Sequence, residues 1–94
     1  MAEVPIELLT GSVLRAARAL MGISAAQLAS ETSVGERTIL RAESFDGPVV
    51  MREANARAII AALERRGVDF IVPDDEGSLG LRRAVYPKAY SANE

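Results

Sequence analysis

The sequence predicts a mainly α-helical domain that ends in a β-hairpin. Over residues 12–66, apolar side chains recur every three or four positions, which is typical of helices with one buried face. Residues 24–43, SAAQLASETSVGERTILRAE, hold two short patterns of this kind on either side of a tight junction at 32–35. After Gly67 the period changes to the alternation that is typical of strands. These three observations define the predicted fold class.

The composition is that of one globular domain with an aliphatic core. The chain has 94 residues, of which 49% are hydrophobic and 26% are charged. Aromatic residues make up only 4%, so Leu, Ile, Val and Ala must form the core. A chain of this size buries only about 60% of its unfolded surface, so a second subunit would help to stabilise it.

The absence of Cys and His narrows the possible functions. Disulfides, thiolate metal sites, a Cys nucleophile, and the commonest general base and metal ligand are all missing. We therefore expect no enzyme activity, no metal site and no cofactor. No apolar run approaches the roughly 18 residues of a membrane span. The start of the chain carries Glu3 and Glu7 before its first basic residue and does not resemble a signal peptide, so we expect a cytoplasmic protein.

The net charge of −2 is unevenly distributed along the chain. Residues 1–14 carry two acids and no base, whereas residues 15–57 carry six Arg against five acids. A local basic face must therefore come from Arg15, Arg18, Arg37, Arg41, Arg52 and Arg57.

The first helix is predicted to run from about residue 12 to Met21, with Thr10 or Ser12 as its cap and Gly22 as its stop. Arg15 and Arg18 fall on the side opposite the apolar stripe. That stripe consists of Val13, Leu14, Ala17, Leu20 and Met21.

Two short helices follow. Ser24 with Gln27 three residues later predicts a capping box at the start of the second helix, whose Leu28 and Ala29 face inward. The third helix is predicted from Gly35 or Glu36 to Ala42 or Glu43, with Ile39 as its core residue.

A last helical stretch is predicted from Val50 to Gly67, with a possible split near Asn55. Its inward stripe is Ala56, Ile59, Ile60 and Leu63. Strands are then predicted at 68–72 and 79–83, joined by an acidic turn at 74–77. Because a lone hairpin is marginally stable, it must either cap its own helices or pair with a second chain.

At these residues the chain resembles the Cro/C1-type (Xre-family) helix-turn-helix regulators. The resemblance covers about residues 12–66. The matching positions are Leu14-Arg15, Ala17-Arg18, Gly22-Ile23-Ser24, Gln27-Leu28-Ala29, Val34, Arg37-Thr38-Ile39, Arg41 and Glu43. The resemblance implies a five-helix DNA-binding domain at 1–67, followed by a hairpin at 68–84 for dimerisation or capping and a flexible tail at 85–94.

The resemblance also implies which residues meet DNA. The groove-reading positions of the family correspond to Gly35, Glu36, Arg37, Leu40 and Arg41, and Thr38 is expected to reach a phosphate. Arg37 and Arg41 share one helix face and suit guanine or phosphate, whereas Glu36 suits the amino group of cytosine. Glu43 is expected to pair with Arg15 or Arg18.

The expected function is that of a transcriptional regulator, more specifically a repressor, which binds a short palindromic operator in double-stranded DNA as a homodimer. The alternative is a protein-interaction module derived from this fold, such as an antiactivator or antitoxin component, with weak or no DNA binding. The acidic net charge favours the alternative, as do Ala25 and Gly35, where the family usually has Gln and Ser or Thr.

Overall fold

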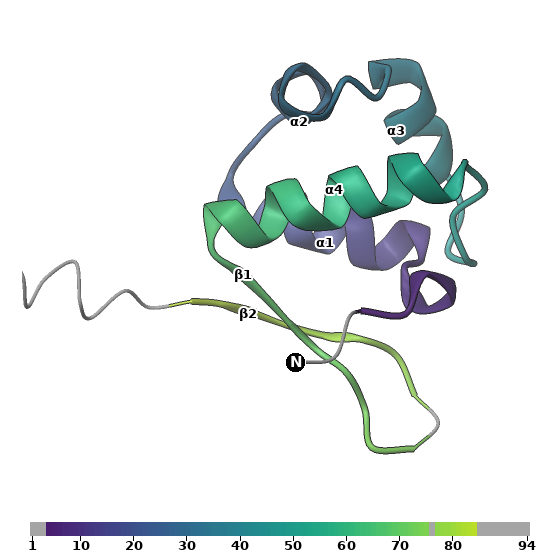
Figure 1. The fold of residues 1–94 in the computed structure, drawn as a ribbon, viewed down its shortest axis with the longest axis vertical. Coiled ribbons are helices and arrows are strands. Elements are labelled where there is room, and N and C mark those ends of the chain that lie inside the picture. The colour runs from purple at the N-terminus through teal and green to yellow at the C-terminus, as the bar shows by residue number, and fades with distance from the viewer. Residues whose placement is uncertain (1–3, 76, 85–94) are drawn as a thin grey trace, which may run out of the picture.

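The computed structural model describes residues 4–75 and 77–84, and it has the helical body and hairpin that the periodicities predict (Figure 1). The predicted tail at 85–94 lies outside the described residues. A 3₁₀ turn, η1 (Ile6–Leu8), precedes the first helix, α1 (Gly11–Met21). The short helices α2 (Ala25–Thr32) and α3 (Glu36–Glu43) follow, then the long α4 (Glu53–Arg66). The strands are β1 (Val68–Ile71) and β2 (Gly80–Arg83).

Local signals in the sequence fix most helix ends. The Thr10 hydroxyl accepts a hydrogen bond from the Val13 N–H at 3.2 Å and caps α1. Gly22 and Gly67 end α1 and α4 in the left-handed conformation, as predicted. The capping box at Ser24 is also present, since Ser24 and Gln27 exchange hydrogen bonds of 2.8 and 3.0 Å between side chain and backbone.

The prediction of five helices is wrong, because the described residues form four α-helices. Residues 50–52 are not helical, and α4 runs unbroken through Asn55. The segment before α4 is instead held in an extended form by the lead-in of the chain. Val49 donates to the Leu9 carbonyl at 3.0 Å, Gly11 donates to the Gly47 carbonyl at 2.9 Å, and Thr10 and Pro48 form an isolated bridge. These long-range bonds delay the start of the helix to Glu53.

The hairpin packs on its own helices. Its two strands pair antiparallel, with Val68 opposite Arg83 and Phe70 opposite Leu81. Both strands contact α1, and β1 also contacts α4, so the hairpin covers the end of the helical body away from α2 and α3 (Figure 1). Val68 is buried, and Phe70 and Leu81 are half-buried against the core.

The core has two parts. The larger lies among the four helices and includes Leu14, Leu28, Val34, Ile39 and Leu63, all at most 3% exposed. The smaller joins the lead-in to α4 and the hairpin and consists of Val4, Leu9, Val13, Ala56, Ile60 and Leu79. The predicted inward stripe of α4 is fully buried, whereas Leu20 and Met21 at the end of α1 are only half-buried.

Candidate nucleic-acid interface

A tight turn joins the two short helices α2 and α3. Ser33 ends α2 with φ 61° and ψ 15°, and it is the one residue other than glycine with positive φ among the described residues. The Thr32 hydroxyl donates to the Leu28 carbonyl at 2.8 Å and accepts from the Val34 N–H at 3.1 Å. Val34 is 3% exposed and anchors the turn in the core. The chain therefore turns within three residues, and α3 packs against α2.

The two faces of α3 differ sharply. Its inner face is buried and consists of Ile39, Ala42 and Glu43. The predicted DNA-contacting residues occupy the other face: Gly35, Glu36, Arg37, Leu40 and Arg41 are exposed, and Thr38 is half-buried. The burial of Ile39 agrees with its prediction as the core residue of this helix, while contact of the outer residues with DNA stays a prediction.

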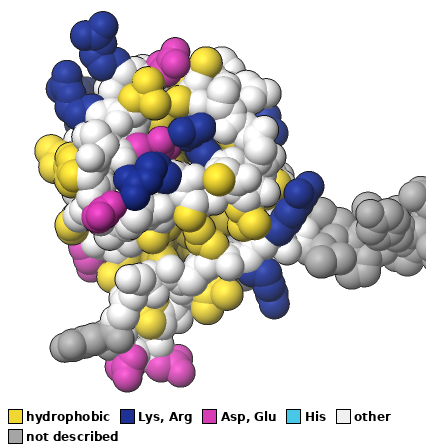
Figure 2. Space-filling model, turned by 180° about the vertical axis from the view of Figure 1, so that it is seen from behind, with side chains coloured by type: hydrophobic (Ala, Val, Ile, Leu, Met, Phe, Trp, Pro, Cys, Tyr) yellow, Lys and Arg dark blue, Asp and Glu magenta, His cyan; other side chains and the backbone are white. Residues whose placement is uncertain are grey.

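An open hollow of about 520 Å³ lies beside the outer face of α3, and the described residues that line it are Glu36, Arg37, Leu40 and Arg41. Within residues 4–75 and 77–84, the side chains of Arg37 and Arg41 have no hydrogen bond or ion pair, so both guanidinium groups are available to a ligand. Lys and Arg side chains project at the upper left of Figure 2, the corner that α3 occupies when the view of Figure 1 is turned. The acidic hairpin tip lies at the lower end of the same view.

Arg18 supports α3 rather than facing solvent. Its Nε and Nη2 donate to the two carboxylate oxygens of Glu43, each at 2.7 Å, and its Nη1 donates to the Ile23 carbonyl at 2.9 Å. The Glu43 side chain is 5% exposed. The hydrogen bonds to Glu43 raise the pKa of Arg18 above its ordinary value. The expected pairing of Glu43 is confirmed, with Arg18 as its partner.

The other arginines of the predicted basic face lie in different settings. Arg15 donates to the Glu43 carbonyl and forms an ion pair with Asp46 at 2.8 Å, so it also braces the end of α3. Arg52 is exposed at the start of α4. Arg57 donates to the Val4 carbonyl at 2.6 Å and holds the lead-in against α4.

Sequence reasoning missed two contacts that position α3 and α2. Gly11 lies so close to the end of α3 that a Cβ there would be 1.9 Å from the Phe45 carbonyl oxygen. Glu31 of α2 accepts hydrogen bonds from Arg66 of α4, two of them 2.9 and 3.0 Å from Nε. Such contacts join residues about 35 positions apart, so local sequence patterns do not predict them.

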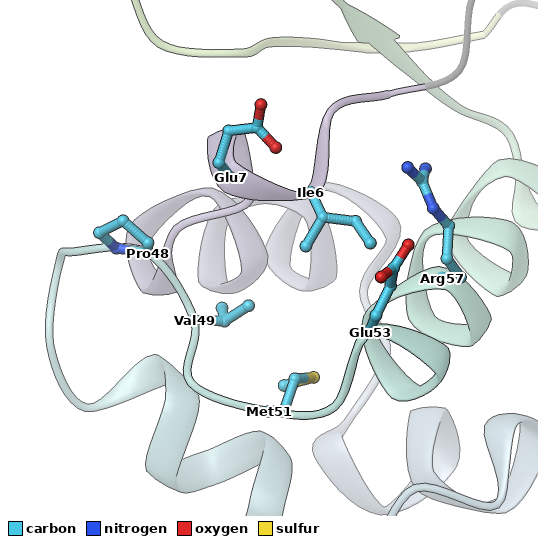
Figure 3. A pocket seen from close by; sticks show the side chains of 7 residues that line it. All are labelled: Ile6, Glu7, Pro48, Val49, Met51, Glu53 and Arg57. Atoms are coloured by element: carbon cyan, nitrogen blue, oxygen red, sulfur yellow. The ribbon is translucent and has the colours of Figure 1, made fainter.

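A second hollow, of about 450 Å³, lies between η1, the extended segment and the start of α4 (Figure 3). Ile6, Val49 and Met51 supply apolar side chains around it, and Glu7 and Glu53 supply carboxylates. Its lining is completed by Pro48 and Arg57.

The chain matches no known family model and no curated protein. Among the described residues, no helix combines the length and apolar character needed to cross a membrane.

Proposed function

We propose that the protein is a sequence-specific DNA-binding transcriptional regulator of the Cro/C1 type, which acts in the cytoplasm and represses by occupying its operator. The observation that carries the proposal is the asymmetry of α3. One face is fixed to the core through Ile39 and Glu43, while the other presents two arginines without partners among the described residues.

The dimensions of α3 suit the major groove. An α-helix with its side chains is about 10–12 Å across, and the groove is about 12 Å wide, so the exposed face of the eight-residue α3 can enter it. Gly35 at the leading end has only the Thr38 hydroxyl within 4 Å of where a Cβ would lie, so the backbone there can approach DNA closely. In this pose Arg37 and Arg41 would bind guanine edges or phosphates, and Glu36 would accept from cytosine.

The supports of α3 explain how it would keep its position on DNA. Arg18 and Arg15 both bond to Glu43, and Gly11 packs against the carbonyls of Ala42 and Phe45. A reading helix held on rigid neighbours loses little freedom on binding, so more of the contact energy appears as affinity.

The proposal includes a homodimer, since a palindromic operator is read by two copies. The hairpin is its candidate interface. A two-stranded sheet has unpaired outer edges, and Ile71 and Val72 beside them are 49% and 39% exposed. Sedimentation of the wild type against an Ile71→Lys variant tests this part separately, with a shift from dimer to monomer expected.

The test of DNA binding is selection of duplexes from a random library, followed by affinities at about 50 and 200 mM salt. Arg37→Ala and Arg41→Ala should each lose about 1–3 kcal/mol of binding free energy if the side chain reads a base. If it binds a phosphate instead, the slope of log affinity against log salt should fall by about 1. Arg65→Ala is the matched control, because Arg65 is also exposed but lies at the far end of α4.

The second candidate function is a protein-interaction module, and the hollow of Figure 3 favours it. Its apolar side chains and carboxylates suit an apolar segment with basic neighbours, and Phe45 and Val50 nearby in sequence are 41% and 78% exposed. If selection enriches no duplex and the variants match the wild type at both salt concentrations, the regulator proposal fails and this candidate replaces it.

A further inference from the structure

Leu40 is an apolar residue among charged residues on the outer face of α3. It is 47% exposed, and its neighbours in the hollow are the charged residues Glu36, Arg37 and Arg41. The other large exposed apolar residues of the described chain lie elsewhere: Phe45 and Val50 in the connection to α4, and Ile71 and Val72 at the hairpin. Leu40 is therefore the one apolar contact that the described part of α3 offers to a ligand.

The helical geometry places Leu40 near the middle of the outer face. At about 100° per residue, the four residues of the hollow follow each other around α3 in the order Glu36, Leu40, Arg37, Arg41. Leu40 and Arg37 are the central two of this series. A ligand that α3 meets face-on would touch Leu40 with carboxylate on one side and guanidinium on the other.

A DNA major groove offers a single kind of apolar group to such a residue. Base edges there present hydrogen-bond donors and acceptors, and the exception is the C5 methyl group of thymine. The same methyl group occurs on 5-methylcytosine. Phosphates and sugars give a half-exposed leucine no comparable partner, because they are polar or lie outside the groove floor.

We propose that Leu40 determines specificity by contacting a pyrimidine 5-methyl group, so that each half-site contains a thymine, or a 5-methylcytosine, beside the guanine bound by Arg37. The inference rests on the proposed function. It adds that discrimination at this position depends on one methyl group and is independent of the hydrogen bonds of the base pair.

The test replaces each thymine of the selected half-site in turn by uracil, which removes only the methyl group. Burying one such group is worth about a fourfold change in affinity, so one position should show about fourfold weaker binding with uracil. At that position Leu40→Ala should bind both duplexes equally. Leu40→Met, which keeps an apolar side chain, should retain most of the ratio. Val50→Ala is the control, since Val50 is exposed but lies off α3.

A second arm places cytosine or 5-methylcytosine at the same position, opposite guanine. The wild type should gain about fourfold on methylation, and Leu40→Ala should gain nothing. The inference is overturned if wild type and Leu40→Ala give the same thymine-to-uracil ratio at every position. Failure of the wild type to bind any duplex is a different result, and it removes the proposed function itself. Because Leu40 is half-exposed, melting of Leu40→Ala should match the wild type and show that the variant is folded.

Discussion

The guanidinium of Arg18 donates hydrogen bonds to both carboxylate oxygens of Glu43, each at 2.7 Å, and thereby joins the end of α1 to the end of α3. The third bond, to the Ile23 carbonyl, adds the turn before α2 to the same cluster. One side chain thus connects three segments around α2 and α3. Glu43 is buried, so its charge is stable there only because Arg18 neutralises it.

Glu43→Gln should lower the free energy of unfolding by about 2–3 kcal/mol. The variant keeps the shape but loses the charge that pairs with Arg18, and the loss is below that of a fully buried pair because Arg18 is 20% exposed. Arg18→Met should be at least as damaging, because it leaves the Glu43 carboxylate buried without this partner. Urea unfolding measures both. The double variant Arg18→Met/Glu43→Gln should lose clearly less stability than the two single losses added together, and strict additivity of the single effects would contradict the pairing.

Gly11→Ala should destabilise the protein by about 3 kcal/mol or prevent folding. Its Cβ would lie 1.9 Å from the Phe45 carbonyl oxygen and 2.4 Å from that of Ala42, so backbone must move. Thermal melting of Gly35→Ala provides the control. Gly35 likewise lies at the start of a helix, as the N-cap of α3, but its φ is −61° and its surroundings are open, so this substitution should cost little stability. Equal melting temperatures for the two variants would contradict the close approach.

Ser33→Gly should stabilise the protein by about 0.5–1 kcal/mol. A side chain at φ 61° is strained, and glycine removes that strain at some cost in unfolded-chain entropy. The same substitution at Ser44 should have the opposite sign, because Ser44 ends α3 in the right-handed conformation and its hydroxyl bonds to the Arg41 carbonyl. Chemical unfolding of the two variants compares them directly. A loss of stability in both would show that Ser33 is not strained.

Stability should fall in acid partly through Glu31. Hydrogen bonds from Arg66 lower the pKa of Glu31 below its ordinary value of 4.5. A lowered folded-state pKa means that the contribution is present above about pH 4.5 and is lost as the pH falls through the folded-state value. The stability difference between wild type and Glu31→Gln should therefore be constant near neutral pH and shrink below pH 4.5. Arg66→Met should likewise weaken the fall of unfolding free energy below pH 4.5. Unfolding measured across a pH series tests both variants.

The part of the fold that the sequence predicts is the part set by local chemistry. Caps and stops depend on residues within one helical turn, so Thr10, Ser24 with Gln27, and Gly22 placed helix ends correctly. The start of α4 depends instead on two hydrogen bonds, from Val49 to the Leu9 carbonyl and from Gly11 to the Gly47 carbonyl, which the pattern from Val50 onward did not indicate. The five-helix expectation failed there.

In the candidate site, too, the features set by local sequence were predictable and those set by long-range contacts were not. Ile39 as the buried residue determines which side chains of α3 face outward, so the outer face was predictable from periodicity alone. The sequence predicted Arg15 or Arg18 as the partner of Glu43. In the structure, Arg18 donates to the Glu43 carboxylate and Arg15 donates to the Glu43 carbonyl. The close approach of Gly11 was not predictable, since its fit depends on a helix that lies thirty residues away along the chain.

The long axis of the molecule, 44 Å, separates α3 from the hairpin, and the two ends differ in charge (Figures 1 and 2). Arg37 and Arg41 lie at one end, and Asp74 and Asp75 lie in the turn at the other. These four described residues form a dipolar charge separation between the α3 end and the hairpin tip, although the net charge of −2 opposes approach to DNA. In the field of a nucleic acid, this dipole would turn α3 toward the phosphates before contact. Orientation during the encounter, rather than overall attraction, would then set the rate of productive association.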